Sequence, residues 1–484
     1  IDATINPDFS QIETDTAQIA VNERFALFFP EKRPFFLEGV DLFDTPIQAV
    51  YTRTLTSPRW GLRGTGKVGA SSYTLLVSED RGGGLVVLPG AESSDFALQD
   101  FRSKVAIGRL RRDFGASFAG LLATAREGEK SQGGGHNRVF GPDFQWRPNG
   151  VDTISGQLLW SDTKNPLRPD LSSSFDGSSE TSHAAQLAWG HAASARDWTV
   201  RVRDFGEGFR ADDGFVPQND FREVSVDVGI RKYPNGFFRF IRPYVYTQLQ
   251  YDHDGDRLYR DSALATFFQG KKNLNASAAF HDEEIRVQGR LLDQRYLNLF
   301  GQFDPSRRVS RVGFTGTIGQ GIDFAGGRVG DQLALSLFAT FRPWERLQLD
   351  VRADRRELDV HRDGVSLRSG RLFTARVERL KATYGFTNRS FVRLIAQRTL
   401  TEQDPLVAGR PVPRRSGDFS GSALYSFKLN WQTVLFAGYG EERALGERGG
   451  FETRSRSVFL KLSYALQRYS RFSRVGVLIA LEAC

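Results

Sequence analysis

The chain is predicted to be all-β: a large antiparallel transmembrane β-barrel of roughly 18–22 strands with a short N-terminal plug or gate segment. Three observations lead to this prediction. Apolar and polar residues alternate repeatedly along the chain, which is the period of a strand with one apolar face. The alternating runs last about ten residues, the length that a tilted strand needs to cross a bilayer. Their polar faces carry charges that are costly to bury in a filled core but can face a watery lumen.

Residues 1–46 do not alternate cleanly, and they contain the run FFPEKRPFFLEG at positions 28–39. Its two prolines exclude the interior of a helix or of a central strand. We expect residues 1–46 to enter the lumen as a plug or to close the periplasmic mouth as a gate, with a plain linker as the alternative. Phe35, Phe36 and Leu37 would then pack on the barrel, and the neighbouring charges would meet charges of the lumen. The candidate plug or gate residues are Phe29, Glu31, Lys32, Arg33, Phe35, Phe36 and Glu38.

Residues 47–484 are predicted to form the barrel, beginning with a paired strand at 47–55 (IQAVYTRTL). The turn YPNG at 233–236 and the connection RPWE at 342–345 separate alternating runs, as in hairpins. The clearest of these runs are 198–203, 223–231, 332–341, 347–354 and 458–467. Their apolar members would touch lipid and their polar members would line the lumen. This predicts lumen-facing side chains at Arg201, Arg203, Asp350, Arg352 and Lys461.

Tryptophans support the same interpretation, because they lie close to proposed turns, where an interfacial aromatic girdle would place them. They are Trp60, Trp146, Trp344 and Trp431. A soluble β-sandwich or propeller is the alternative fold. Its strands would typically have about 5–6 residues, and it would have to bury the charged faces of the runs. The barrel therefore accounts better for both the length and the charge of the alternating runs.

Charge and cysteine content exclude several classes of protein. The net charge is +8, from 65 basic and 57 acidic residues, and the sequence has no basic helix and no block of Lys or Arg. Nucleic-acid binding is therefore disfavoured. The single cysteine, Cys484, excludes an internal disulfide framework and a cysteine-rich metal site. The chain begins IDATINPDF and contains no methionine, so we expect a processed chain or a fragment of a longer protein.

A search for catalytic groups leads to no named reaction. The run HDEE at 281–284 concentrates acid and base groups, but we expect it to be a charged turn between two strands. The run DHDGD at 252–256 resembles a calcium loop, yet it lacks the glycine and the glutamate that an EF-hand requires. The six histidines are scattered, and no nucleophile elbow occurs. We therefore predict no catalytic residue, no cofactor and no metal, and lean against an enzyme.

The start of the chain resembles a bacterial family. The run NPDFSQIETDTAQIAVNERFALFFPEKRPFFLEGVDLF, followed by YTRTL and by Gly64–Lys67, is similar to the start of the C-terminal β-barrel domain called DUF5916. The resemblance is strong to about residue 80, and beyond it only the hairpin pattern and the run VFLKLSYAL are similar. It implies an outer-membrane barrel, sometimes labelled a membrane-associated hydrolase without an established reaction. Members often carry a family-9-type carbohydrate-binding module upstream, which the printed sequence does not contain, so sugar binding is carried over to none of its residues.

The expected location is the bacterial outer membrane, and the expected function is passage or docking of a solute or partner at the cell surface. The expected partners are the lipid bilayer, a glycan or anionic solute, and a periplasmic or surface protein. Two alternatives remain open. One is a membrane-embedded hydrolase of envelope or glycan substrates, and the other is an anchor for an upstream carbohydrate-binding domain.

Overall fold

The structure is a computed structural model that describes residues 1–7, 9, 12–361, 368–430, 433–446, 449–464 and 478–479. Trp431 and Cys484, both singled out in the sequence, lie outside these residues. No helix in the described part of the chain is long and apolar enough to cross a membrane.

Almost all strands belong to one sheet of 24 strands. Three of them are short, namely β1 (Asp2–Ile5), β22 (Arg415–Ser416) and β26 (Leu478–Ile479), and the other 21 have 10 to 18 residues. The first long strands are β2 (Pro58–Val68), β3 (Ser71–Asp80), β6 (Ser103–Phe114), β7 (Ser117–Gly128), β8 (His136–Trp146), β9 (Asp152–Lys164) and β10 (Ser179–Ala192). Next come β11 (Arg196–Phe205), β12 (Phe221–Ile230), β13 (Phe238–Tyr251), β14 (Arg257–Gly270), β15 (Asn275–Val287), β16 (Arg290–Phe303) and β17 (Val309–Asp323). The last are β18 (Arg328–Trp344), β19 (Leu347–Val360), β20 (Gly370–Thr387), β21 (Ser390–Gln403), β23 (Asp418–Lys428), β24 (Thr433–Leu445) and β25 (Phe451–Tyr464).

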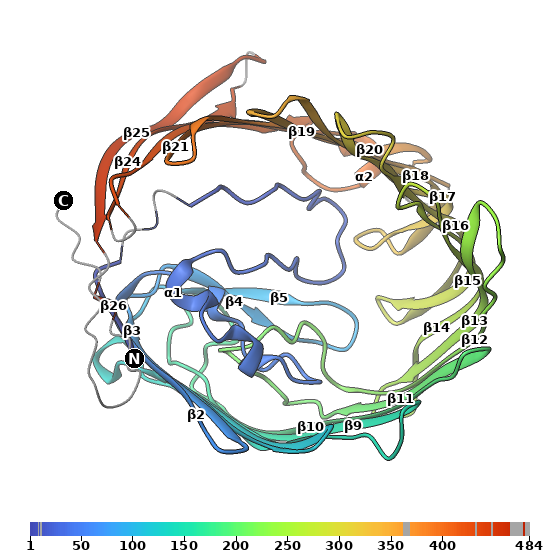
Figure 1. Cartoon of the computed structure of the whole chain (residues 1–484). Helices are drawn as coiled ribbons and strands as arrows, with labels where there is room; N and C mark the ends of the chain where they lie inside the picture. The colour runs from blue at the N-terminus through green and yellow to red at the C-terminus, as the bar shows by residue number, and fades with distance from the viewer. Residues whose placement is uncertain are drawn as a thin grey trace.

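The sheet curves into a ring that Figure 1 shows along its axis. Consecutive long strands pair antiparallel from β2 to β25, and β1 pairs antiparallel with β2 and parallel with β26. The predicted all-β antiparallel barrel is confirmed, and its 21 long strands lie within the predicted range. The strands predicted around residues 198–203, 223–231, 332–341, 347–354 and 458–464 are all present.

One predicted strand is wrong. Residues 47–55 form coil and a short 3-10 helix, η2 (Thr52–Thr54), and the first long strand begins at Pro58. The physical reason is that their backbone groups bond to the interior of the ring and not to a neighbouring strand. The amide of Ile47 donates to Gln157 Oε1 at 2.7 Å, and the amide of Tyr51 donates to the carbonyl of Asp213 at 2.6 Å.

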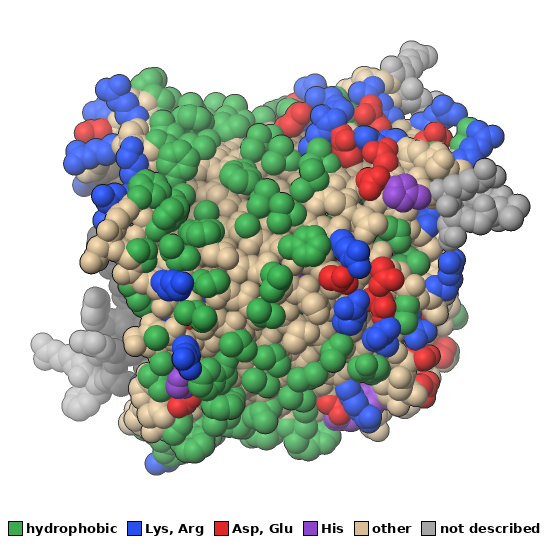
Figure 2. Space-filling model, turned by 90° about the vertical axis from the view of Figure 1, so that its right-hand side faces the viewer, with side chains coloured by type: hydrophobic (Ala, Val, Ile, Leu, Met, Phe, Trp, Pro, Cys, Tyr) green, Lys and Arg blue, Asp and Glu red, His purple; other side chains and the backbone are tan. Residues whose placement is uncertain are grey.

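Alternation along the strands separates an apolar outer face from a polar inner face. In β18, Leu333, Leu335 and Leu337 are exposed, Leu337 to 48%, whereas Thr340 on the opposite face is buried. Exposed leucines and valines of this kind occur on strand after strand, and Figure 2 shows apolar side chains spread over the wall. An exposed apolar wall is the surface that contact with lipid requires.

The connections differ in length at the two ends of the ring. At one end, called the short-turn end here, turns of two to seven residues join consecutive strands. At the other, the long-loop end, the connections include 81–102, 165–178 and 206–220. The first of these contains the separate hairpin of β4 (Gly84–Leu88) and β5 (Asp95–Gln99). The remaining helical turns are η3 (Lys130–Gln132) and α2 (Pro405–Ala408).

The N-terminal segment, residues 12–46, lies within the ring together with the β4–β5 hairpin (Figure 1). It contains α1 (Pro34–Leu37) and a 3-10 helix, η1 (Val40–Phe43). Phe36 and Phe43 of the segment pack in the largest buried apolar cluster. The cluster also contains inward side chains of the wall, among them Leu76, Ile107, Leu122 and Leu159. The main core therefore lies between the N-terminal segment and one side of the ring.

Candidate functional site

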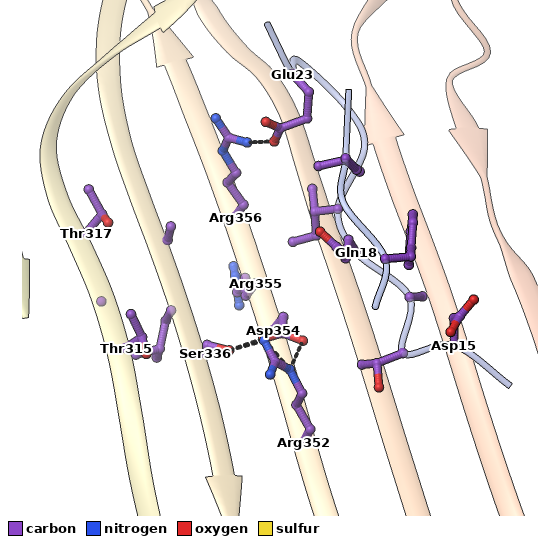
Figure 3. Close-up of a pocket in the computed structure, with 18 of the residues that line it drawn as sticks. Asp15, Gln18, Glu23, Thr315, Thr317, Ser336, Arg352, Asp354, Arg355 and Arg356 are labelled. Carbon is purple, nitrogen blue, oxygen red and sulfur yellow. Dashed lines mark hydrogen bonds and ion pairs between the residues drawn. The ribbon is translucent and has the colours of Figure 1, made fainter. Parts of the chain in front are cut away.

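A cavity of about 480 Å³ separates the N-terminal segment from strands β17–β19 (Figure 3). One side of it is formed by residues 15–32, including Gln18 and Glu23. The other side is the inner face of the wall, with Thr315, Thr317, Ser336, Arg352, Asp354 and Arg356. A volume of this size is within the range of small-molecule sites.

The charges around this cavity are largely paired with each other. Arg352 donates to Asp354 Oδ2 at 2.8 Å and to Ser336 Oγ at 3.0 Å. Arg356 pairs with Glu23 of the N-terminal segment. Burial raises the pKa of Glu23, and the positive charge of Arg356 only partly opposes this. The lining therefore offers hydroxyl, amide and paired charged groups to a polar molecule.

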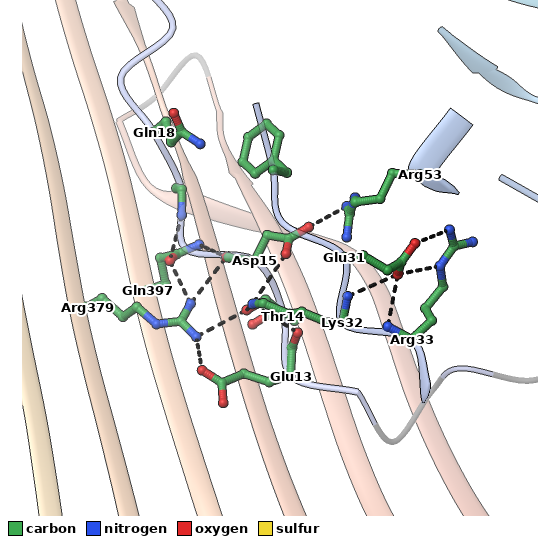
Figure 4. Close-up of polar contacts among 12 residues, drawn as sticks. Glu13, Thr14, Asp15, Gln18, Glu31, Lys32, Arg33, Arg53, Arg379 and Gln397 are labelled. Atoms are coloured by element: carbon green, nitrogen blue, oxygen red, sulfur yellow. Dashed lines mark hydrogen bonds and ion pairs between the residues drawn. The ribbon is translucent and has the colours of Figure 1, made fainter. Parts of the chain in front are cut away.

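A second contact between the N-terminal segment and the wall is centred on Glu13 (Figure 4). Its carboxylate meets three cations of the inner wall, at 2.9 Å from Arg379, 2.7 Å from Lys381 and 3.7 Å from Arg393. Gln397 of β21 accepts a hydrogen bond from the amide of Ala17 at 3.0 Å. The segment is thus attached to β20 and β21 through both charge and backbone hydrogen bonds.

The environment of Glu13 favours its charged form. Burial opposes that charge, but hydrogen bonds and positive charge from Lys381 and Arg379, aided by Arg393, outweigh burial and hold the pKa of Glu13 below its ordinary value. Glu13 is therefore ionised at neutral pH, and its contact with the wall is an attraction between full charges.

The stretch around 29–33 lies beside the stretch around 13–18 (Figure 4). Lys32 Nζ is 3.2 Å from Asp15 Oδ1. Glu31 and Arg33 pair with each other at 2.7 Å, and Arg33 also donates to the carbonyls of Thr52 and Leu55. Hydrogen bonds from Arg33 and Thr52 outweigh the burial of Glu31, so that its pKa is lowered. These charges were expected to meet the lumen wall. They instead pair with each other and with residues 15, 52 and 55 of the chain.

The aromatic residues of the N-terminal segment differ in their contacts. Phe36 is fully buried, whereas Leu37, expected to pack on the barrel, is 42% exposed. Phe35 lies against the wall at Gly61, where an added Cβ would come within 2.9 Å of its ring. Phe29 exchanges backbone hydrogen bonds with the hydroxyl of Tyr51.

Among the predicted charges, only Glu38 meets a wall cation, Arg63, at 3.7 Å.

Five buried arginines of the wall were missed in the sequence: Arg63, Arg109, Arg126, Arg328 and Arg379. Arg109 donates to the carbonyls of Leu42 and Asp44, both at 2.7 Å. Arg126 pairs with Asp213 of loop 206–220, whose pKa burial raises to about 6 although Arg126 opposes the shift. Alternation could have identified Arg109, because it follows the buried Val105 and Ile107 at the same period.

The five residues predicted to face the lumen alternate with outward apolar residues. Arg352 lines the cavity, and Asp350 accepts a hydrogen bond from Thr340 at 2.7 Å. Arg203 pairs with the buried Glu223, and Lys461 is itself buried. Arg201 and Arg203 flank Val202, whose side chain is 49% exposed on the outer face.

The run 281–284 is not a turn but part of β15. Alternation divides it between the two faces. His281 stacks on Tyr296 and lies 3.1 Å from Asp261 on one face, whereas Asp282 pairs with Arg260 on the other. Within the residues that the structure describes, no group of three or more His, Cys, Asp or Glu is arranged to hold a metal ion.

Comparison with known proteins gives one family match. The sequence model of a domain of unknown function (DUF5916) matches residues 1–57, which confirms the resemblance over that stretch. No curated protein matches the chain.

Solved structures with a similar course of the chain include two receptors and one transporter. The siderophore receptor PiuA from Acinetobacter baumannii has a TM-score of 0.49 and 9% identity, over 84% of this chain and 80% of that one. The ferric citrate transporter FecA has a TM-score of 0.46 and 10% identity, over 96% of this chain and 89% of that one. The ferric yersiniabactin uptake receptor FyuA from Yersinia pestis has a TM-score of 0.39 and 10% identity, over 84% of this chain and 70% of that one.

Proposed function

We propose that this chain is a barrel of the bacterial outer membrane, that its lumen is a route for a polar solute, and that residues 1–46 are its plug. The observation that carries the proposal is the attachment of the N-terminal segment to separate parts of the inner wall. Glu13 is bound to β20 and β21, and the carbonyls of Leu42 and Asp44 are bound to Arg109 of β6. A segment held in this way crosses the lumen.

The outer face supports a location in the membrane. Strands of 10 to 18 residues are long enough to cross the apolar layer, and their exposed leucines and valines would be unfavourable in water. A ring of strands bonded to one another also satisfies the backbone hydrogen bonds that lipid cannot. Barrels of this kind are typical of bacterial outer membranes.

The interior supports a route for a solute. Barrels of 16–18 strands already leave an aqueous lumen unless something fills it, and the wall here has 21 long strands. The cavity between the N-terminal segment and β17–β19 is lined by hydroxyl groups and paired charges. The hydroxyl groups and arginines can hydrogen-bond an anionic or highly hydroxylated solute, and Ile19, Leu27 and Phe29 give the same cavity an apolar side.

Conductance of the full chain in a planar bilayer tests the plug. In Glu13→Lys, a new cation replaces the carboxylate that meets Arg379, Lys381 and Arg393. We expect the segment to leave this part of the wall and the variant to conduct more often, or with larger steps, than the native chain. Glu345→Lys, in the exposed turn between β18 and β19, has the same charge change and is the matched control.

A charge exchange completes the test. Glu13→Lys combined with Arg379→Glu and Lys381→Glu restores opposite charges across the contact and should return conductance toward the native level. The proposal fails if Glu13→Lys conducts no differently from the native chain and from Glu345→Lys, whether all three are closed or all three are open.

A further inference from the structure

The turns at the short-turn end carry a strong excess of positive charge. In the ten connections of this end, nine residues are basic and only two, Asp304 and Glu345, are acidic. The basic residues are Arg147, Arg231, Lys232, Lys271, Lys272, Arg307, Arg308, Arg346 and Arg389. Eight of the nine lie on five turns that follow one another around the ring, between β12 and β21. They therefore form a continuous basic arc, called the basic rim here.

Most cations of the basic rim have no anionic partner among the described residues. Arg231 pairs with Asp197, but the other eight are exposed and make no ion pair with the described part of the chain. The outer face near the long-loop end differs. There Arg398 pairs with Glu378, and Arg456 pairs with Glu441. These two outer-face cations are thus neutralised within the protein, whereas eight of the nine cations of the basic rim are not.

Exposed aromatic residues indicate the depth of the basic rim relative to the lipid bilayer. Aromatic rings with a large exposed surface prefer the boundary between the apolar layer and the lipid headgroups. Such rings lie in or beside the same turns, one to five positions from a rim cation: Tyr233, Phe237, Phe303, Trp344 and Phe386. Figure 2 shows Lys and Arg side chains at both edges of the apolar wall, with few Asp or Glu among them at the left-hand edge and many at the right-hand edge. Turns of two to seven residues cannot carry these cations far past the headgroups.

We infer that the basic rim binds the phosphates of anionic phospholipids in the leaflet that surrounds the short-turn end. Arg offers two parallel donors to a phosphate and Lys offers a compact charge, so both residue types of the rim suit this ligand. A lipid headgroup is favoured over an acidic soluble protein because the aromatic rings hold the cations at headgroup level. By the usual arrangement of such barrels, with short turns on the periplasmic side, this is the periplasmic leaflet.

Lipid selectivity of the full chain tests this inference without any variant. The protein is placed in discs that contain equal amounts of phosphatidylcholine and phosphatidylglycerol, and the lipid retained after removal of the bulk lipid is quantified by mass spectrometry. We expect enrichment of phosphatidylglycerol that decreases as salt is raised, because salt screens the attraction. Equal retention of the two lipids at low salt overturns the inference.

A matched pair of variants assigns the selectivity to the basic rim. The rim variant combines Lys271→Gln, Lys272→Gln, Arg307→Gln and Arg308→Gln. The control combines Arg102→Gln, Lys130→Gln, Arg410→Gln and Arg414→Gln, four exposed cations of the long-loop end, and has the same change in net charge. Since a cation close to an anionic surface is worth about a fivefold change in association, the rim variant should lose about tenfold or more of its selectivity. The control should keep it.

Three results contradict the inference in the variant experiment: unchanged selectivity of the rim variant, equal loss in both variants, or capture of polyglutamate by the rim in phosphatidylcholine discs without any lipid preference. The last result would assign the rim to an acidic protein partner. Conductance does not enter this experiment, so it is independent of the proposed route for a solute.

Discussion

Glu13 combines two properties that rarely occur together on one side chain. It belongs to an irregular segment, yet it meets three cations of the regular wall, and these cations keep it ionised although it is partly buried. Removing such a carboxylate leaves the cations facing one another without a counter-charge, which is more costly than the loss of an exposed pair. Glu13 therefore supplies the charged part of this attachment, and Gln397 and Arg379 add hydrogen bonds to the backbone of residues 14–17.

Acid should loosen this contact. Because the pKa of Glu13 is lowered in the folded chain, its ion pairs contribute fully above its ordinary value of 4.5 and are lost as pH falls through the lowered pKa. We expect the conductance of the native chain to rise when pH is lowered from neutral into that acidic range. Glu13→Gln should conduct more at neutral pH and respond less to acid. A pH response that is the same in both proteins would contradict the assignment to Glu13.

The charged run 31–33 illustrates which side-chain contacts a sequence can predict. Its charges stand out in the sequence, and the expectation that they meet the wall was reasonable for a plug. Their partners are instead Asp15, Thr52 and each other, because the chain folds back beside its own earlier residues. The pairing depends on that return path, for which residues 1–46 carry no periodic signal.

Individual strands were predicted well because their period is a direct consequence of the two environments. The hairpin of β18 and β19 has apolar leucines on one face and Asp350, Arg352 and Asp354 on the other, as the alternation indicated. The only part of this hairpin that differs is its turn. β18 continues through Arg342, Pro343 and Trp344, and only Glu345 and Arg346 remain outside the two strands.

The cost of a charge on the outer face should depend on its depth. Leu337 lies in the middle of β18 and is exposed, so Leu337→Arg should lower the free energy of unfolding by about 2–4 kcal/mol. Phe237→Arg, in the exposed turn between β12 and β13, should cost at most about 1 kcal/mol. Guanidinium unfolding of the protein from phospholipid vesicles measures both values. Equal losses in the two variants would contradict the assignment of the outer face to lipid.

Two predicted elements, the turn at 281–284 and the strand at 47–55, were wrong because one local signal competed with another. The run 281–284 is rich in charge, which is typical of a turn, but its residues alternate between the faces of β15 and each face supplies a partner. Residues 47–55 are apolar enough for a strand, but Gln157 and Asp213 of the interior take up their backbone amides. Charge and hydropathy could not reveal these partners, which lie far away in the sequence.

The charge distribution of the whole molecule becomes visible only when the topology is known. The sequence shows a net charge of +8 without any block of Lys or Arg. The ring brings nine basic and two acidic turn residues to one end, which leaves a net charge of +7 there. Each basic pair looks ordinary in its own turn, and the strands between the turns separate the pairs by tens of residues. The rim could therefore not be found by scanning for clusters.

A ring of consecutively paired strands should also resist detergent as a unit. We expect the protein, once folded into lipid or mild detergent, to migrate differently on an SDS gel when it is left unheated than when it is boiled. The reason is that opening the ring would have to break a complete ladder of backbone hydrogen bonds at once. Identical migration of heated and unheated samples, or solubility of the folded chain without any detergent, would contradict the barrel.

The pairing of β1 with β2 limits how the lumen can open. Ile5 is the register partner of Trp60, and the amide of Asn6 donates to the carbonyl of Arg59 at 2.7 Å. The stretch between them is therefore a loop whose two ends are fixed side by side on the paired strands β1 and β2. Both of its ends are held by the wall, so it would move as a tethered loop and not as a free chain end. A solute on the proposed route would travel alongside this loop, and the loop would then form part of the selectivity filter.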